Sequence, residues 1–504
     1  MRGCLWKRLS HWLMGFTGIT LLLLVIVAPV LLLLLRKYFR KRREATSSQH
    51  VTVAFFHPYC NTGGGGERVL WCAVKALNTR FPSVRMVIYT GDLDVSPEDI
   101  LKRVHQRFNV ELHTDQVGFV YLRWRRLLEA DRYPLFTILG QSIGSFLLGL
   151  EAILTYVPDI YIDTTGHAFT YPLFRYVGGC RVGCYTHYPV ITSDMLRRVS
   201  TRTVAYNNRR IVARSPFLTA GKLLYYKLFA WVYGAAGRSA EIVMVNSSWT
   251  EEHINELWQC PLRTHRVYPP CDVEDLKNIP IDNDRDAGIP SSLDVGSGDT
   301  VSISGADKKV VKIVSVAQYR PEKDHPLQLR SMYQLRQYVP EDVWDSLRLI
   351  FVGSCRNAED DVRVQDMKDL CKHLSLENNV EFKVNVPYEE LRRELEEGSV
   401  GLHAMWNEHF GIGVVECMAA GLIMVAHRSG GPQMDIVEEA EGSRNGFLAA
   451  DEQEYASAIA HILRMSPEAR KSIREAARSS VERFSVQEFN KGFLRAVEPL
   501  FSQR

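Results

Sequence analysis

Cysteine pairs of the Cys-x-x-Cys type are missing from this chain of 504 residues. The chain has ten cysteines, but no two of them form a Cys-x-x-Cys motif. Because zinc sites and disulfide frameworks are usually recognised by such spacings, both have little support here. Cys180 and Cys184 stand at the start of an expected strand, where thiols buried in a reducing compartment explain them better. We therefore expect neither a cysteine metal site nor a disulfide.

An excess of positive charge is also missing from most of the chain. Nine of the 61 lysines and arginines flank one apolar segment near the amino terminus, which leaves 52 elsewhere against 58 aspartates and glutamates. A protein that binds duplex nucleic acid needs a basic face, so we expect no nucleic-acid partner. The charged share of 24% also argues against many membrane spans.

One long apolar run without charged residues occupies residues 12–35. Its length is about what a helix needs to cross a bilayer core, and it is too long for the apolar part of a signal peptide. The following stretch RKYFRKRR carries six basic residues, whereas three precede the run. Because basic flanks stay on the cytoplasmic side, residues 1–48 are predicted to form a single-pass anchor with the large body in the cytoplasm.

Two further apolar stretches, residues 135–157 and 217–237, contain charges. Glu151 interrupts the first, and Lys222 and Lys227 interrupt the second. We expect helices that pack in a core or lie on the membrane surface, rather than further spans. Residues 217–237 contain lysines interleaved with aromatic residues. For this stretch, burial in the core and a place on the membrane surface are equally open alternatives.

Short apolar, β-branched runs alternate with helical patterns in two regions of the chain. Such alternation is typical of parallel sheets covered by helices on both faces, so the sequence predicts an α/β protein. The predicted domains are 49–276 and 309–480, separated by a polar Gly-, Ser- and Asp-rich linker or exposed insertion at 277–308 and followed by a helical segment at 481–504. Two such domains would place a cleft between them.

The first glycine cluster, HPYCNTGGGGERVL, lies between an expected strand and an expected helix. Glycine lets the backbone approach a ligand closely, and the free N–H groups of a helix start attract anions. No Lys-Ser or Lys-Thr pair follows, so the cluster is not a phosphate loop of the Walker type. We expect the four glycines, Gly63 to Gly66, to approach an anionic ligand, with a simple flexible turn as the alternative.

A second candidate site is EHFGIGVVECMAAG, where Glu408 and Glu416 flank a glycine turn. A helix that begins near Gly413 would place Glu408 in the preceding loop and Glu416 in its first turn. The N–H groups of Gly411, Ile412 and Gly413 would then address an anion between the two carboxylates. A glycosidase uses two carboxylates but has no need of an anion-binding turn. A nucleotide sugar, which offers both phosphates and hydroxyls, fits better.

Other polar residues follow expected strands. Arg320 and Lys323 could neutralise a departing diphosphate, and His187 stands at the carboxyl end of a strand, where open α/β sheets bind ligands. Asp92-Leu93-Asp94 resembles the Asp-x-Asp motif on which metal-dependent glycosyltransferases of a different fold hold a divalent ion. Helix capping explains these aspartates equally well. We expect no metal, because Arg, Lys and helix-terminal N–H groups can stabilise the leaving group.

These motifs carry a resemblance to a known family. EHFGIGVVECMAAG resembles the E-x7-E signature of retaining glycosyltransferases of family 4, which have the GT-B fold. The resemblance covers nearly the whole chain after the anchor, through HPYCNTGGGGERVLWCAVKAL, DIYIDTTGHAFTYPLF, GCYTHYPVITSDML, SVAQYRPEKDHPLQL and HRSGGPQMDIV. Together these segments are similar to the mannosyltransferases of asparagine-linked glycosylation. This implies an α/β GT-B enzyme with two Rossmann-like domains facing across a cleft and one N-terminal transmembrane helix.

The resemblance also implies an activity. It indicates transfer of mannose from GDP-mannose, in α-1,2 linkage and with retention, onto dolichol-diphosphate-linked Man3GlcNAc2, sequentially to Man5. The expected location is the cytoplasmic face of the endoplasmic reticulum membrane, and other early N-glycosylation mannosyltransferases are candidate partners. Two alternatives stay open: a related membrane glycosyltransferase that uses UDP-N-acetylglucosamine, and a non-catalytic scaffold subunit of a glycosylation complex.

Residue roles follow from the same resemblance. It places Glu408 at the donor sugar, Glu416 at the nucleotide ribose and His187 near the reacting centre. It places Gly411–Gly413 around the diphosphate, and Gly65 and Gly66 at the donor phosphates.

The chain departs from the family pattern before its Pro-Glu-Lys stretch. Where many relatives have Gly-Arg, this chain has Ala317 and Gln318, and the arginine has moved to position 320. Lys323 keeps its place, so it is the firmer of the two basic candidates. His167, in TTGHAF, receives no catalytic assignment.

Overall fold

The computed structural model describes residues 27, 29–44, 50–201, 216–281, 283–289, 310–440 and 442–502. Residues 29–44 form a helix that starts inside the predicted anchor. Most of the predicted span over residues 12–35, and much of the predicted linker over residues 277–308, lie outside the described residues.

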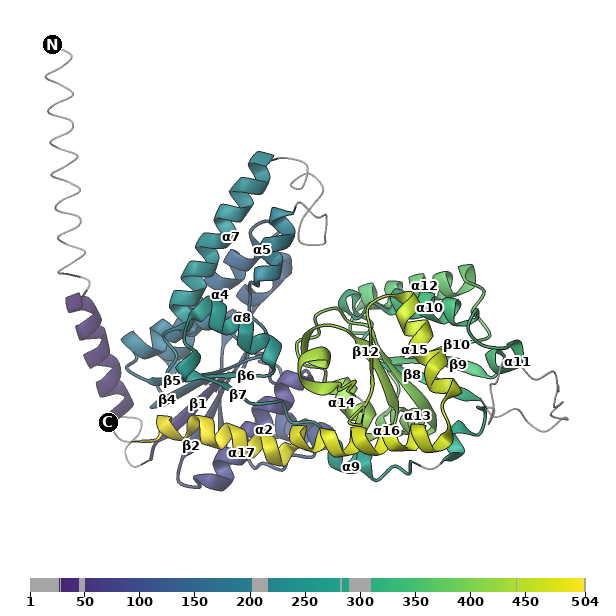
Figure 1. Cartoon of the computed structure of the whole chain (residues 1–504). Coiled ribbons are helices and arrows are strands. Elements are labelled where there is room, and N and C mark those ends of the chain that lie inside the picture. The colour runs from purple at the N-terminus through teal and green to yellow at the C-terminus, as the bar shows by residue number, and fades with distance from the viewer. Residues whose placement is uncertain are drawn as a thin grey trace, which may run out of the picture. The chain divides into compact units, whose positions relative to one another are not determined.

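Contacts divide the chain into two compact units, each with one sheet (Figure 1). Unit 1 contains the described residues up to Val245, together with 252–265 and those from Phe493 onward. Unit 2 contains residues 246–251 and 266–492. The division therefore falls at residue 266 rather than at the expected 276. The intervening residues belong to unit 2 because Cys271 donates its N–H to Phe484 and bridges to Ser485.

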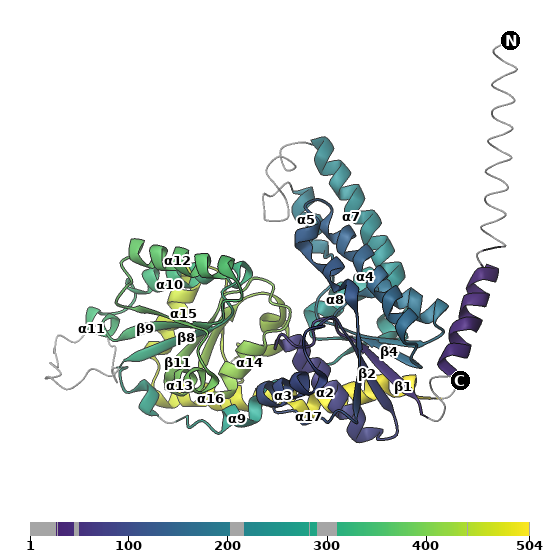
Figure 2. The same cartoon turned by 180° about the vertical axis from the view of Figure 1, so that it is seen from behind.

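Unit 1 is built on a seven-stranded sheet with the order β3-β2-β1-β4-β5-β6-β7. Its strands are β1 (Thr52–Phe56), β2 (Arg85–Thr90), β3 (Val117–Tyr121), β4 (Ile160–Asp163), β5 (Arg181–Thr186), β6 (Ile242–Val245) and β7 (Thr264–Arg266). Figure 2 labels β1, β2 and β4 of this sheet. The main helices beside it are α2 (Gly65–Arg80), α3 (Pro97–Phe108), α4 (Thr137–Thr155), α5 (Ser193–Ser200), α7 (Pro216–Gly237) and α8 (Ser248–Trp258). The order reverses between β1 and β4, and a parallel sheet binds ligands at the carboxyl ends of its strands at such a point.

Unit 2 is built on a six-stranded parallel sheet with the order β10-β9-β8-β11-β12-β13. Its strands are β8 (Val311–Val316), β9 (Leu347–Gly353), β10 (Val380–Val384), β11 (Gly398–His403), β12 (Ile423–His427) and β13 (Phe447–Ala449). Its helices are α9 (Val273–Lys277), α10 (His325–Leu335), α11 (Glu341–Trp344), α12 (Ala358–His373), α13 (Tyr388–Glu397), α14 (Ile412–Ala419), α15 (Glu452–Arg464) and α16 (Pro467–Ser480). Helix α17 (Val486–Val497) has residues in both units.

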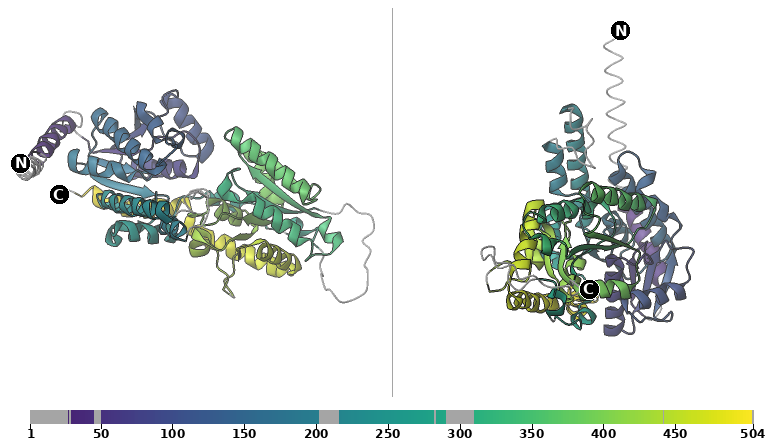
Figure 3. Two further views of the ribbon diagram at one scale, coloured as in Figure 1. Left: turned by 90° about the horizontal axis from the view of Figure 1, so that it is seen from above. Right: turned by 90° about the vertical axis from the view of Figure 1, so that its right-hand side faces the viewer.

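Helices cover both faces of the sheet in unit 2. Successive residues of β8 belong to different apolar clusters, Ile313 to one and Val314 to the other, because strand side chains alternate between faces. The Ile313 cluster contains side chains of α10, α12 and α15, and the Val314 cluster those of α9, α13, α14 and α16. Figures 1 and 3 show helices on both faces of this sheet. This double covering explains the almost continuously apolar strands of the sequence.

Capping residues mark the starts of two helices. Ser466 accepts a hydrogen bond from Ala469 at the start of α16, and Pro467 occupies the first helical position. Ser247 accepts from Thr250 and caps α8. Strands β7 and β13 have only three residues each, so their signals in the sequence are weak.

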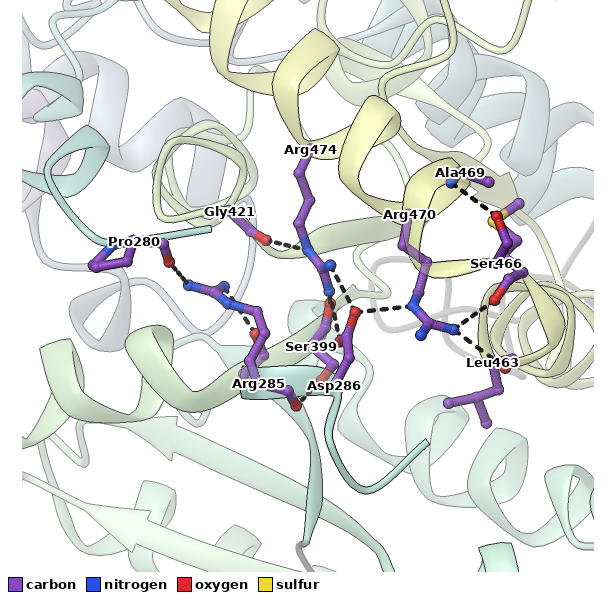
Figure 4. A network of polar contacts seen from close by, with 12 residues as sticks. Pro280, Arg285, Asp286, Ser399, Gly421, Leu463, Ser466, Ala469, Arg470 and Arg474 are labelled. Atoms are coloured by element: carbon purple, nitrogen blue, oxygen red, sulfur yellow. Dashed lines mark hydrogen bonds and ion pairs between the residues drawn. The ribbon is translucent and has the colours of Figure 1, made fainter. Parts of the chain in front are cut away.

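The segment expected to be an exposed linker or insertion is partly buried in unit 2. Residues 283–286 form a short 3-10 helix, and both Arg285 and Asp286 are buried. Asp286 accepts hydrogen bonds from Arg470 and Arg474 of α16, each at 2.8 Å (Figure 4). Arg285 donates to the carbonyl groups of Gly398 and other residues. The polar composition misled the prediction because these charges are paired inside the unit rather than solvated.

The two apolar stretches form helices α4 and α7 of unit 1. Among the described residues, α4 has the length and composition of a membrane span, and 39% of its most apolar window is buried. Glu151 accepts hydrogen bonds from the N–H groups of Arg123 and Trp124, at 2.7 and 3.0 Å, which ties α4 to the preceding loop. The charge that interrupts the apolar run therefore has a structural partner within the unit.

Candidate active site

In unit 2, the candidate residues gather at the carboxyl ends of β8, β11 and β12. Glu408 lies in the loop after β11 and is half-buried, with 13% of its side chain exposed. Its carboxylate lies 2.5 Å from Nζ of Lys323, in the loop after β8, and 3.0 Å from Nε2 of His403, the last residue of β11. The structure thus brings together two predicted residues, Glu408 and Lys323, and adds a histidine that the prediction missed.

The charge state of this cluster is determined by its contacts. Burial alone raises the pKa of Glu408, but the charge of Lys323 and the hydrogen bond from His403 outweigh it and hold the pKa well below its usual value. Burial lowers the pKa of His403, although Glu408 opposes this shift. At neutral pH the cluster therefore contains an ionised carboxylate and a neutral imidazole whose Nε2–H donates to it.

The glycine turn after Glu408 has the conformation of an anion site. Gly411 has φ of +114° and precedes α14, which begins at Ile412. The N–H groups of Val414 and Val415 bond to the Gly411 carbonyl, whereas no acceptor within the described residues takes those of Ile412 and Gly413. Glu416 is half-buried and lies in the second turn of α14. The predicted position in the first turn was wrong, because the helix begins at Ile412, one residue before the expected start at Gly413. Free N–H groups at a helix start can bind a phosphate.

A second glycine loop supports Glu408 from the end of β12. Ser429 accepts a hydrogen bond from the N–H of Asn407 at 2.7 Å, and the N–H of Gly431 donates to the Glu408 carbonyl at 2.7 Å. Gly430 has φ of +58°, and a Cβ there would lie 2.3 Å from that same carbonyl oxygen. The segment HRSGGPQMDIV carries this loop, but only the structure shows that it supports Glu408.

Replacing Gly430 by alanine should therefore displace Glu408. We expect transfer activity to fall by about 10- to 100-fold, since small displacements of positioning groups have effects of this size. Gly442→Ala is the matched control, because Gly442 also has positive φ (+88°) but a Cβ there meets no atom within 4 Å. Both variants carry backbone strain, so equal activity losses at equal melting temperature would contradict the positioning role.

The ion pair of Arg320 is with a residue outside the Glu408 cluster. Arg320 forms an ion pair with Glu322 at 2.5 Å, and 42% of its side chain is exposed. Lys323, by contrast, has 20% of its side chain exposed and contacts Glu408 directly. Arg320 remains a candidate for the donor phosphates, whereas Lys323 already lies beside the carboxylate.

In unit 1, the candidate residues gather at the carboxyl ends of β1, β4 and β5. A Cβ on Gly66 would lie 3.3 Å from Nε2 of His187, so this glycine lets the histidine lie directly against the turn. His187 also approaches the Thr164 carbonyl at 3.1 Å. No acceptor among the described residues takes the N–H groups of Gly65 and Gly66. His187 and a pair of anion-binding donors therefore share one edge of this sheet.

A buried carboxylate adjoins the same glycine turn. Glu67 Oε2 accepts from Gly64 N–H and Thr62 Oγ1, at 2.5 and 2.6 Å, while its buried Oε1 has no hydrogen-bond partner within the described part of the chain. A free buried acceptor suits a ligand hydroxyl. The prediction used this stretch only for its glycines and missed Glu67.

Two further histidines lie beside His187. Burial, together with His187 and His167, lowers the pKa of His57 to about 3, so this ring is neutral. Burial also lowers the pKa of His167. Asp163 holds this region in place, because it accepts hydrogen bonds from the N–H groups of Gly166 and His167 and from the hydroxyl of Tyr171. His167 thus lies near the candidate site without a contact that would give it a chemical role.

The two aspartates of the possible metal motif, Asp92 and Asp94, have different surroundings. Asp92 forms an ion pair with Arg125 and accepts from Thr90, while Asp94 is exposed. Within the described ranges, no cluster of three or more His, Cys, Asp or Glu side chains has the arrangement of a metal site.

Known proteins are similar to this chain over both units. The family model described as "ALG11 mannosyltransferase N-terminus" matches residues 50–258, and that of "Glycosyl transferases group 1" matches residues 299–480. A human protein named GDP-Man:Man(3)GlcNAc(2)-PP-Dol alpha-1,2-mannosyltransferase is 50% identical, covering 90% of this chain and 87% of its own. Proteins of the same name from Dictyostelium discoideum and Kluyveromyces lactis are 42% and 35% identical over 90% of this chain, and cover 85% and 79% of their own lengths.

Solved structures agree on the fold. Sucrose-phosphate synthase from Thermosynechococcus elongatus has a TM-score of 0.62 at 15% identity, over 90% of this chain and 99% of that one. A glycosyltransferase from Rickettsia africae has a TM-score of 0.57 at 15% identity, over 90% and 100%. At such low identity these likenesses concern the fold alone, and the predicted GT-B class with two Rossmann-like domains is confirmed.

Proposed function

The chain belongs to the family of GDP-Man:Man(3)GlcNAc(2)-PP-Dol alpha-1,2-mannosyltransferases, and on this premise we propose how its residues perform the transfer. It is a glycosyltransferase that moves mannose from GDP-mannose in α-1,2 linkage onto dolichol-diphosphate-linked Man3GlcNAc2. Two successive additions would give Man5. The structural observation that supports the residue assignment is the ionised Glu408, held between Lys323 and His403 beside the free N–H groups of α14.

The donor is proposed to bind along the carboxyl edge of unit 2. The N–H groups of Ile412 and Gly413 take diphosphate oxygens, and Glu416 takes the ribose hydroxyls. We propose that the ammonium group of Lys323 leaves its contact with Glu408 and pairs with the leaving phosphate instead, since a phosphate carries more charge than a carboxylate. Glu408 then faces the sugar. Donors fixed in place before the reaction stabilise the departing GDP without reorganising.

The stereochemistry follows from the two bonds involved. Mannose leaves an α-linked diphosphate and arrives in an α linkage, so its configuration is retained. We propose that the bond from C1 to the phosphate oxygen breaks as the acceptor hydroxyl attacks C1 from the same face. The hydroxyl proton passes to the departing phosphate oxygen, which balances the charge. Glu408 stabilises the positive charge that develops on the sugar ring, and His187 is proposed to act close to the reacting carbon.

No metal ion is proposed to take part. The lysine and helix-terminal N–H groups supply the charge stabilisation that a divalent ion supplies in other glycosyltransferases. Activity should therefore remain within about twofold after treatment with EDTA. Complete loss of activity that manganese restores would contradict this and would implicate Asp92 and Asp94 instead.

The location is proposed from the sequence and the family. A single amino-terminal span would hold both units on the cytoplasmic face of the endoplasmic reticulum membrane, where a dolichol-linked acceptor is presented. Other early N-glycosylation mannosyltransferases are proposed as partners. Cysteine labelling from each side of sealed microsomes tests the topology, and labelling of the large body only after membrane permeabilisation would contradict it.

The donor nucleotide can be tested by ligand-induced thermal stabilisation. We expect GDP and GDP-mannose to raise the melting temperature of the purified full chain, and UDP-N-acetylglucosamine to leave it unchanged. Stabilisation by the uridine nucleotide alone would favour the related enzyme considered from the sequence. The absence of any nucleotide effect would favour a scaffold.

A further inference from the structure

A basic cavity of about 430 Å³ lies at the end of the unit 1 sheet opposite to the candidate active site. Asp159 precedes β4, and Arg181 opens β5, so the cavity is at the amino ends of these strands. The other arginines that line it are Arg36 and Arg43 of the amino-terminal helix and Arg175. In Figures 1 and 2 the carboxyl-terminal end of this helix, drawn in purple, lies beside unit 1.

The amino-terminal helix is attached to unit 1 by specific contacts. Phe39 is buried, with 3% of its surface exposed. Arg43 forms an ion pair with Asp159 at 3.2 Å and donates to the Gly179 carbonyl at 3.3 Å. Arg42 donates to the Thr155 carbonyl. The cavity wall formed by this helix is therefore a built part of the unit.

The charges around the cavity do not balance. Glu241 pairs with Arg175 and Arg181, at 2.7 and 2.9 Å, and Asp159 pairs with Arg43. Four arginines face two carboxylates, which leaves a net charge of +2. Arg36 has no carboxylate within ion-pair distance among the described residues, and its Nε lies 3.4 Å from the position of a Cβ on Gly179. Its guanidinium is at the cavity and available to an anion.

The position of Arg36 along its helix indicates the source of that anion. Residues Val30, Leu31, Leu33 and Leu34 just before it are each more than half exposed, as expected for side chains that face lipid. Charged residues begin at Arg36, where the predicted span ends. Phosphate headgroups lie at this depth of a bilayer, and arginine binds phosphate through paired N–H groups.

We propose that this cavity binds the phosphate of an anionic phospholipid headgroup. Arg36 is the principal donor, and the pairs with Asp159 and Glu241 hold Arg43, Arg175 and Arg181 in place around the cavity. A headgroup seated here would fix the orientation of unit 1 on the membrane surface. The site is separate from the proposed donor site, because it lies at the amino ends of β4 and β5 whereas His187 follows the carboxyl end of β5.

The test measures thermal stabilisation of the detergent-solubilised full chain in saturating GDP, which occupies the proposed donor site. The probes are dioctanoyl phosphatidylserine, dioctanoyl phosphatidylcholine and inorganic phosphate. We expect only phosphatidylserine to raise the melting temperature in a saturable way. Equal effects of phosphatidylcholine would overturn recognition of an anionic headgroup. Equal effects of inorganic phosphate would overturn the lipid as its source.

Arg36→Gln and Arg40→Gln provide the matched comparison. Both remove one positive charge from exposed positions of the same helix, but Arg40 lies outside the cavity and pairs with Glu44. We expect Arg36→Gln to weaken the apparent affinity for phosphatidylserine about tenfold, and Arg40→Gln by less than about twofold. Equal affinities for the two variants would overturn the proposal. GDP stabilisation should persist in both, which keeps this test independent of the proposed function.

Discussion

Replacing Glu408 by glutamine is expected to lower the rate of mannose transfer by about 100- to 1,000-fold, the range found when one preorganised charge-stabilising group is removed. The amide is neutral, so it neither stabilises positive charge on the sugar nor holds Lys323 at 2.5 Å. GDP lacks the mannose that Glu408 is proposed to face, so GDP binding should change by less than about threefold. Steady-state transfer assays and GDP titration measure these two effects on the same protein.

Glu397→Gln is the control for this experiment. Glu397 also pairs with a lysine, Lys312, but it precedes β11 at the opposite end of the strand, and Lys312 keeps its second partner Glu394. We expect its transfer rate to stay within about twofold of the unmodified protein. A Glu408→Gln variant that turns over at the normal rate would remove Glu408 from the active site.

Replacing Asp286 by asparagine is expected to destabilise the protein by about 3–5 kcal/mol, because it leaves buried arginines without a negative partner. Arg474 is fully buried, and Arg470 is nearly so. Burial alone raises the pKa of Asp286, but Arg474 and Arg470 outweigh it and lower the pKa below its usual value. The stabilisation is therefore complete above about pH 4 and is lost as the pH falls through the folded-state pKa. Urea titration at several pH values measures both effects.

A charge pair on the same helix provides the comparison. Glu475 pairs with Lys471 on α16, and both side chains are 57% exposed. Glu475→Gln should change the free energy of unfolding by less than about 0.5 kcal/mol. A similarly small effect of Asp286→Asn would show that residues 283–286 do not hold α16 in place.

Much of the fold could be predicted because its signals are local. Apolar strands between amphipathic helices predict two parallel sheets, and caps such as Ser466 mark the helix starts. The errors have a common cause in contacts distant along the chain. Asp286 is separated from Arg474 by 188 residues, so the polar composition of its segment gave no indication of burial. The division near residue 266 likewise depends on contacts with Phe484 and Ser485.

Candidate site residues were predictable where a sequence motif directly follows a strand of a parallel sheet. Glu408, Lys323 and His187 each follow a strand at the ligand-binding edge of a parallel sheet, and the structure places all three there. His403 was missed because a histidine at the end of an apolar strand resembles a core residue. The contact between Gly430 and Glu408 was not predictable, because it joins two loops whose approach depends on the pairing of β11 with β12.

The central claim is that this chain transfers mannose from GDP-mannose to a lipid-linked acceptor through the site around Glu408. Its most direct test incubates the purified full chain with labelled GDP-mannose and defined dolichol-diphosphate-linked Man3GlcNAc2, followed by linkage analysis of the product. We expect labelled mannose in α-1,2 linkage, and at least about 100-fold less product with Glu408→Gln. Absence of transfer by the intact protein, a β-linked product, or unchanged transfer by Glu408→Gln would contradict it.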